Sequence, residues 1–188
     1  MKDKLAIFDM DGTLIDTRLV NFRSYQAALA EEGVTLTYDY FVRECFGKGY
    51  KDYLPPLVGD DREKLERIHK RKIGLYKDYI DEARLNTTLV DFIRGMKGAY
   101  YMALVTTASK DNVLDELKHF DLDKDFDLVL TGEDIPRHKP DPQGFLMAMD
   151  RLKVPAENTV IFEDSDVGIE AAKISGASVI RIINKDIL

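Results

Sequence analysis

The sequence predicts an α/β fold in which a doubly wound, Rossmann-like parallel sheet carries a helical insertion after its first strand. Three observations lead to this prediction. Short, nearly continuous apolar runs recur along the chain, which is typical of strands that are covered on both faces. Helical patterns separate the later runs, and strands that alternate with helices imply right-handed crossovers in one sheet. A long stretch of helical pattern without a strand follows the first run.

Five apolar runs are expected to form the sheet. Each of them is short and rich in branched or aromatic residues, which favours strands over helices. The runs are LAIF at 5–8, YMALVTT at 101–107, DLVL at 127–130, TVIF at 159–162 and SVIRII at 178–183.

Helices are expected between the later strands. Apolar residues recur at helical spacing after Ser109, which is placed to cap the helix that follows. In DPQGFLMAMDRL, Asp141 is the expected N-cap and Pro142 the first helical residue. The segment SDVGIEAAKISG is typical of a helix that ends at Gly176.

The insertion covers residues 17–83, because the segment between the first strand and Leu85 contains helical patterns and no convincing strand. One expected helix carries Phe22, Tyr25 and Leu29 on the same face. A longer one carries Leu65, Ile68, Tyr76 and Ile80. We therefore predict a sheet domain made of residues 1–16 and 84–188, and a second domain made of residues 17–83.

Composition and charge exclude several classes of partner. The chain has 188 residues and a formal net charge of -7, and this acidic balance argues against binding to nucleic acid or to anionic membranes. The single cysteine, Cys45, cannot form an internal disulfide. No apolar run has the length of a membrane span, and the N-terminal run is too short for a signal peptide. We expect a cytoplasmic protein.

Polar and charged residues follow the expected strands at the points where they end. Asp9 and Asp11 follow the first strand, hydroxyl residues including Thr107 follow the second, and the loop after the third contains Lys139. Glu163 and Asp164 follow the fourth. In an open α/β sheet, ligands bind beyond the carboxyl ends of the strands. Oxygen ligands for a hard cation, together with a lysine and free amides, suit a phosphate group bound with magnesium.

Each of these features also has an ordinary structural explanation. An Asp-Gly pair between apolar runs is a strong hairpin signal. The DMDG stretch also resembles part of a calcium loop, but that loop needs a glutamate where this chain has Val20, and a helix where it has a strand. A lone threonine or lysine is usually a turn or surface residue, and an acidic pair before a helix favours the helix N-terminus. The joint occurrence of all four features, in this order, favours the catalytic explanation.

The chain resembles the haloacid dehalogenase superfamily, in the branch with a small helical cap that includes phosphoglycolate phosphatases and β-phosphoglucomutases. The first family motif matches FDMDGTLID, with Asp9 and Asp11 as its two aspartates. The second falls on Thr107, and the third on Lys139 in HKPDPQGF. The fourth is matched by FEDSDVGIEAAKISGA, which begins with the acidic pair Glu163 and Asp164. The resemblance extends over nearly the whole chain.

The resemblance implies a role for each motif residue. Asp9 is the expected nucleophile that forms an aspartyl-phosphate, and Asp11 the expected general acid and base. Lys139 and Thr107, with the amide of Ala108, are expected to bind the phosphate. The expected ligands of Mg²⁺ are Asp9, the backbone carbonyl of Asp11, Asp164 and, directly or indirectly, Glu163.

The insertion is then expected to be a cap that closes over the site and contacts the substrate. The cap residues that the resemblance implies as substrate contacts are Asn21, Gly47, Lys48 and Lys51. The resemblance predicts a Mg²⁺-dependent phosphatase that acts on a small phosphorylated metabolite. His119 and His138 lack the spacing of metal ligands and are expected to be surface or structural residues.

Two other functions stay open. The first is a hexose phosphomutase of the β-phosphoglucomutase type. Such mutases carry a histidine and an arginine where this chain has Asn21 and Tyr50, which favours hydrolysis. The second is a binding protein without catalysis, against which the retention of both Asp9 and Asp11 argues. We expect a monomer, as is usual in this branch.

Overall fold

The structure is a computed structural model that describes residues 2–46 and 48–183. The chain divides into two compact units. The first contains Met1–Asp16 and Arg84–Leu188, and the second contains Thr17–Ala83.

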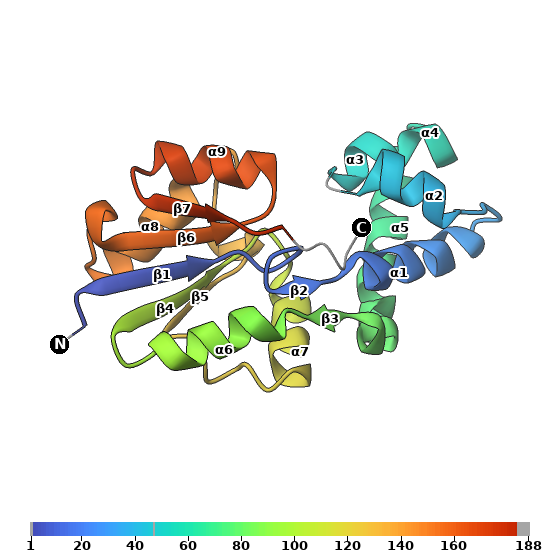
Figure 1. The fold of residues 1–188 in the computed structure, drawn as a ribbon. Helices are drawn as coiled ribbons and strands as arrows, with labels where there is room; N and C mark the ends of the chain where they lie inside the picture. The colour runs from blue at the N-terminus through green and yellow to red at the C-terminus, as the bar shows by residue number, and fades with distance from the viewer. Residues whose placement is uncertain (1, 47, 184–188) are drawn as a thin grey trace. The chain divides into compact units, whose positions relative to one another are not determined.

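The first unit contains a sheet of five parallel strands in the order β5-β4-β1-β6-β7 (Figure 1). The central strand β1 pairs with β4 in the register Ile7 to Ala103, and with β6 in the register Ile7 to Ile161. All five strands that the sequence predicts are therefore present, and the predicted fold class is confirmed. The bounds are Lys4–Phe8 for β1, Tyr100–Val105 for β4, Leu128–Leu130 for β5, Thr159–Glu163 for β6 and Ser178–Arg181 for β7.

Helices cover both faces of this sheet, as the sequence predicts (Figure 1). The helices α8 and α9 share one apolar core with side chains of the strands, among them Ile7 of β1, Phe145 of α8 and Ala171 of α9. On the other face Phe8 stacks on Phe162 with ring centroids 4.7 Å apart, and Phe92 of α6 packs against Phe162. The helices are α6 (Thr87–Met96), α7 (Lys110–His119), α8 (Gln143–Leu152) and α9 (Asp166–Ile174), with short 3-10 turns at Gly132–Asp134 and Ala156–Asn158.

Two helix starts differ from the sequence prediction. Ser109 stands at the N-cap of α7, but its side chain forms no capping hydrogen bond. Glu133 accepts the N–H of Lys110 instead, at 2.9 Å. The helix α8 has Pro142 as its N-cap and begins one residue later than expected, although Asp141 still accepts the N–H of Gln143. Gly176 follows the end of α9 with φ +82°, as the sequence predicts.

A two-stranded antiparallel sheet, which the sequence did not indicate, marks both ends of the insertion. It consists of β2 (Ile15–Asp16) and β3 (Arg84–Leu85), with Asp16 opposite Arg84. Asn86 holds the second end in place, because its side chain caps α6 at Leu89 and donates to the carbonyl of Thr13. The chain therefore leaves the first unit and returns to it at neighbouring points.

The second unit is helical and has a core of its own. Its two long helices, α1 (Arg18–Ala30) and α5 (Arg62–Leu75), contribute buried residues such as Leu29 and Ile68. The predicted long helix is shorter than expected, because the chain tightens into a 3-10 helix after Leu75. The remaining elements are α2 (Tyr38–Tyr40), the π-helix Phe41–Cys45, α3 (Tyr50–Tyr53), α4 (Pro55–Val58) and the 3-10 helix Tyr76–Glu82.

Among the described residues, no helix has both the length and the apolar character that crossing a bilayer requires. The cytoplasmic location and the monomeric state stay predictions.

Candidate active site

Asp9 lies at the carboxyl end of the central strand. The apolar strand β1 ends at Phe8, and the N–H of Asp9 donates to the carbonyl of Phe162 on β6 at 3.0 Å. This bond continues the sheet by one residue and directs the aspartate to the edge where ligands bind in open α/β sheets. Asp9 is only 6% exposed, so its carboxyl group is held in a largely water-free environment.

A tight loop follows Asp9 and contains Asp11 and Gly12. Three consecutive amides, those of Thr13, Leu14 and Ile15, donate to the carbonyl of Met10, which closes the loop on itself. Gly12 has φ +89°, a conformation that residues with a side chain rarely adopt. A Cβ atom at this position would also lie 2.3 Å from Oδ2 of Asp164. The glycine is therefore required both by the turn and by the close approach of the second acidic pair.

Glu163 and Asp164 stand at the end of β6, next to β1 in the sheet. Oε1 of Glu163 accepts three hydrogen bonds, from the amides of Asp164 and Ser165 and from Oγ of Ser165, at 2.8–3.2 Å. Oδ1 of Asp164 accepts a hydrogen bond of 2.8 Å from Oγ1 of Thr13. These contacts fix the orientation of both carboxylates, and Ser165 also caps α9 by accepting the N–H of Gly168.

Lys139 joins the two acidic pairs. It lies in the loop between β5 and α8, and its Nζ is 2.5 Å from Oδ1 of Asp9 and 2.6 Å from Oε2 of Glu163. The peptide bond that follows it, to Pro140, is cis. The ammonium group is 130 residues from Asp9 in the chain, so this contact depends on the sheet order that places β1 between β4 and β6.

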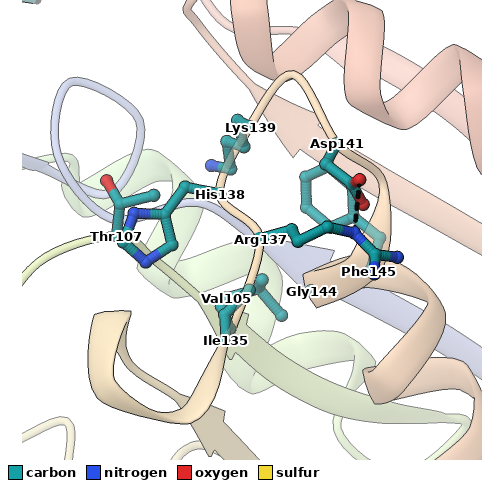
Figure 2. A pocket seen from close by; sticks show the side chains of 9 residues that line it. All are labelled: Val105, Thr107, Ile135, Arg137, His138, Lys139, Asp141, Gly144 and Phe145. Carbon is teal, nitrogen blue, oxygen red and sulfur yellow. Dashed lines mark hydrogen bonds and ion pairs between the residues drawn. The ribbon is translucent and has the colours of Figure 1, made fainter.

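The loop after β4 contains the predicted phosphate-binding residues. The N–H of Thr106 donates to the carbonyl of Leu130, and the N–H of Ala108 donates to Oγ1 of Thr106 at 3.0 Å. Thr107 and Lys139 line the same small cavity, with a volume of about 10 Å³, which is space for about one water molecule (Figure 2). The structure therefore places Thr107 close to the loop between β5 and α8 that contains Lys139, which we call the lysine loop. The amide of Ala108 already has a partner within its own loop.

Burial determines the protonation behaviour of the site. Burial raises the pKa of Asp9, and the Lys139 ammonium opposes this rise. Burial alone would lower the pKa of Lys139, but Asp9 and Glu163 outweigh it and raise that pKa above its ordinary value. Burial also raises the pKa of Asp164. We conclude that Lys139 carries a positive charge that favours the ionised form of Asp9.

Three carboxylates gather around this lysine. Asp9, Glu163 and Asp164 each offer one carboxylate oxygen, and these three oxygens lie within 4.8 Å of one another. Like charges at this separation need positive charge between them, of which Lys139 supplies one unit. Carboxylate oxygens are the ligands that Mg²⁺ prefers, so the donor set fits this ion. Asp11, whose backbone carbonyl was the expected ligand, does not contribute its side chain to this set.

The predicted cap residues lie in the second unit. Asn21 of α1 donates to the carbonyl and to Oγ1 of Thr17, the residue that precedes this helix. Lys48 and Lys51 form exposed ion pairs with Glu44 and Glu66, at 3.6 and 3.8 Å. Gly47 is outside the described residues.

Sequence reasoning missed the residues that orient the acids. Thr13 and Ser165 hold the acidic pair by hydrogen bonds, and Gly168 leaves space for Glu163, since a Cβ there would lie 2.1 Å from its Cδ. The only sequence signal for these residues was their proximity in the chain to the motif acids, since each stands within five residues of one.

Comparisons with known proteins agree on one family. Residues 6–182 match the family profile described as "Haloacid dehalogenase-like hydrolase". The chain is 32% identical over 177 residues to "Phosphorylated carbohydrates phosphatase" of Thermotoga maritima, which covers 91% of this chain and 81% of that protein. It is 28% identical over 180 residues to "Fructose-1-phosphate phosphatase YqaB" of Escherichia coli K12, covering 94% of each chain.

Solved structures agree with this assignment. The structure of CbbY from Rhodobacter sphaeroides in complex with phosphate superposes with a TM-score of 0.81 at 26% sequence identity. The match covers 95% of this chain and 85% of the other.

Proposed function

The chain belongs to the haloacid dehalogenase-like hydrolases and is a phosphatase, and from this premise we propose that it hydrolyses a small phosphorylated carbohydrate through an aspartyl-phosphate on Asp9. The observation that carries the proposal is the contact of Lys139 with both Asp9 and Glu163 at the carboxyl edge of the sheet. Burial raises the pKa of the Asp9 carboxyl and the Lys139 ammonium opposes that rise, and a carboxylate held beside an ammonium in this way is suited to attack phosphorus.

In the first step an oxygen of Asp9 forms a bond to phosphorus while the bond from phosphorus to the ester oxygen breaks. Asp11 gives its proton to the leaving oxygen, so that an alcohol departs rather than an alkoxide. In the second step Asp11 takes a proton from water, and the water oxygen attacks the phosphorus of the aspartyl-phosphate. The bond to Asp9 then breaks, which releases inorganic phosphate and restores both aspartates.

The remaining residues bind and orient the phosphate group. Lys139 neutralises charge on the phosphoryl oxygens and Thr107 orients them, while the Ala108 amide exchanges its hydrogen bond to Oγ1 of Thr106 for one to the phosphate. Mg²⁺, held by Asp9, the carbonyl of Asp11 and Asp164, would offset the repulsion between the nucleophile and the phosphate when bound. Glu163 uses one oxygen for the loop amides and the other for Lys139, which supports an indirect role in metal binding.

Two observations within the second unit support hydrolysis over phosphomutase activity. The positions of the mutase histidine and arginine are occupied here by Asn21 and Tyr50. Asn21 is hydrogen-bonded to Thr17, and the Tyr50 ring stacks on His69 with centroids 3.8 Å apart and planes within 6°. Neither side chain offers the cation that would hold a second phosphate while the aspartyl-phosphate survives.

We propose that the second unit is the cap that selects the substrate. The carbohydrate class is supported by the printed names of two relatives, a phosphorylated carbohydrates phosphatase and a fructose-1-phosphate phosphatase. This protein shares 32% and 28% sequence identity with these relatives, so the individual sugar has to be identified by assay.

The test is a phosphate-release assay over a panel of sugar phosphates with Mg²⁺, and the same panel with EDTA. We expect release that EDTA abolishes and that added Mg²⁺ restores. Asp9→Asn should lower kcat by at least about 10³-fold with an unchanged melting temperature. Asp150→Asn, at an exposed ion pair with Lys153, is the matched control and should retain activity.

A coupled isomerisation assay with a bisphosphate primer separates the alternatives. Isomer conversion without net phosphate release would favour the phosphomutase. Turnover by Asp9→Asn at the wild-type rate would contradict the proposed nucleophile.

A further inference from the structure

Gly132 connects the two loops that carry the predicted phosphate-binding residues. Its N–H donates to the carbonyl of Ala108 at 2.8 Å, and its carbonyl accepts a hydrogen bond of 3.1 Å from Nε2 of His138. A Cβ on Gly132 would lie 2.6 Å from the carbonyl oxygen of Thr107. The Gly132 backbone is therefore packed directly against the loop after β4. The His138 ring links the lysine loop to the carbonyl of Gly132.

The lysine loop is closed on itself by other side chains. The N–H of Arg137 donates to Gln143, Nε of Arg137 donates to Asp141 at 2.7 Å, and the N–H of Asp141 donates to the carbonyl of His138. Figure 2 shows the Arg137 side chain extending to Asp141, whereas the His138 ring extends the other way, toward Thr107. The Arg137 contacts keep the loop compact, but the His138 ring is what joins it to Gly132.

The two loops meet at one small cavity. Thr107, His138 and Lys139 all line this cavity, whose volume of about 10 Å³ is space for about one water molecule. Because His138 directly precedes Lys139 in the chain, displacement of its ring would be transmitted to the backbone of the lysine.

We propose that His138 is a positioning residue for phosphate transfer. By donating Nε2–H to Gly132, it sets the separation between the Lys139 loop and the Thr107–Ala108 backbone. Both loops carry groups that are proposed to bind the transferring phosphate, and a displacement of about 1 Å between such groups can lower a rate by about 10²-fold. His138 itself does not contact the phosphate. The inference rests on the proposed phosphatase function.

The chemistry of the bond distinguishes positioning from proton transfer. Gly132 offers only a carbonyl, so Nε2 must carry the hydrogen, and it does so in the protonated ring as well as in one neutral tautomer. A glutamine side chain also ends in an N–H donor. A positioning role therefore predicts rescue by glutamine and a pH profile that the substitutions leave unchanged in shape.

The experiment compares His138→Ala and His138→Gln with His119→Ala, an exposed histidine on α7 that serves as the matched control. The readouts are kcat and KM for p-nitrophenyl phosphate with Mg²⁺, the inhibition constant of inorganic phosphate, the pH profile of kcat and the melting temperature. We expect His138→Ala to lower kcat/KM by about 10- to 100-fold and to weaken phosphate inhibition by about 5-fold, with little change in melting temperature. His138→Gln should recover most of both losses, and His119→Ala should match the wild type.

Three results would overturn the inference. These are wild-type kinetics in His138→Ala, failure of glutamine to rescue together with an altered pH profile, and a loss of activity that only follows a fall in melting temperature. If the wild type shows activity while His138→Ala is unaffected, only the His138 inference fails. If the wild type releases no phosphate from any ester, the proposed function fails first.

Discussion

Gly12 is subject to two constraints, a positive φ and a close contact of any added Cβ, and each of the other described glycines has at most one of these. It has φ +89°, and a Cβ there would meet the carboxylate of Asp164 at 2.3 Å. Gly176 has a similar φ of +82°, but a Cβ there would make only an ordinary contact of 3.7 Å with Ala156. A substitution at Gly176 therefore tests backbone strain alone, whereas a substitution at Gly12 tests backbone strain together with steric conflict at Asp164.

We predict that Gly12→Ala and Gly176→Ala both lower the free energy of unfolding by about 1–3 kcal/mol, the cost of a side chain at positive φ. Only Gly12→Ala should also displace Asp164, and it should raise the Mg²⁺ concentration needed for half-maximal activity by at least about tenfold. Chemical denaturation and Mg²⁺ titrations measure these effects. Equal Mg²⁺ dependence in the two variants would show that the Asp164 contact is not important.

The acids of the site were predictable from the sequence, whereas the residues that orient them were not. Asp9 and Glu163 stand next to the ends of apolar runs, Lys139 lies in the loop that follows another run, and parallel strands end at one edge of a sheet. Thr13 bonds Asp164 across 151 residues, and Gly132 bonds His138 through a backbone carbonyl. Such contacts depend on loop conformation, which leaves no periodic pattern in the sequence.

Two helices of the first unit begin with a serine at the N-cap, but only one of these serines acts as a cap. Ser165 accepts the N–H of Gly168 and donates to Glu163. Oγ of Ser109 is buried and has no hydrogen-bond partner in the described part of the chain, and Glu133 accepts the first amide of α7.

Ser165→Ala should lower the free energy of unfolding by about 1 kcal/mol, the usual contribution of an N-cap. It should also lower activity, because Glu163 loses one of its donors. Ser109→Ala should be neutral or stabilising by up to about 1 kcal/mol, since a buried hydroxyl without a partner is removed. Thermal and chemical unfolding of both variants measures the difference. A larger loss in Ser109→Ala than in Ser165→Ala would contradict this assignment of the caps.

The helix α5 carries a histidine that makes the second unit sensitive to acid. Nδ1 of His69 forms a hydrogen bond of 2.7 Å with the Tyr25 hydroxyl, and the His69 ring stacks on Tyr50. Burial, assisted by Lys72, lowers the pKa of His69 from its ordinary 6.5 to about 4. Between these two values the unfolded chain binds more protons than the folded one, so stability falls as the pH falls from about 6.5 toward 4.

We therefore expect the melting temperature of the wild type to fall more steeply over this interval than that of His69→Gln, by a few degrees in total. His119→Gln should keep the steep wild-type dependence. A His69→Gln variant with the same slope as the wild type would show that His69 does not cause the sensitivity.

At the level of elements, the sequence predicted those with a long pattern and missed those without one. The five sheet strands are nearly continuous apolar runs, and all five are present. The strands β2 and β3 have two residues each, too few for any periodicity, and are defined by their pairing with one another. The helix α5 was predicted too long, because the 3-10 turn at Tyr76–Glu82 keeps an apolar spacing close to that of an α-helix.

At the scale of the whole molecule, the β2–β3 strand pair allows the two units to be tested separately. Asp16 and Arg84 are directly opposite each other in this antiparallel pair, so a two-residue Asn-Gly turn should join them in place of residues 17–83. The first unit has its own apolar core between the sheet and the helices α8 and α9. We expect the shortened chain to unfold in one cooperative transition in denaturant.

The shortened chain should retain all the residues proposed for chemistry, from Asp9 to Asp164, and should hydrolyse p-nitrophenyl phosphate in a Mg²⁺-dependent manner. It should lose selectivity, so that kcat/KM values for different sugar phosphates lie within about 3-fold of one another, because substrate choice is proposed to belong to the second unit. The comparison with the full chain uses the same panel of esters. If the shortened chain folds and keeps the full chain's order of preference, then the first unit selects the substrate. In that case the proposed role of the second unit as a selective cap is wrong, while the assignment of the chemistry to Asp9 stands.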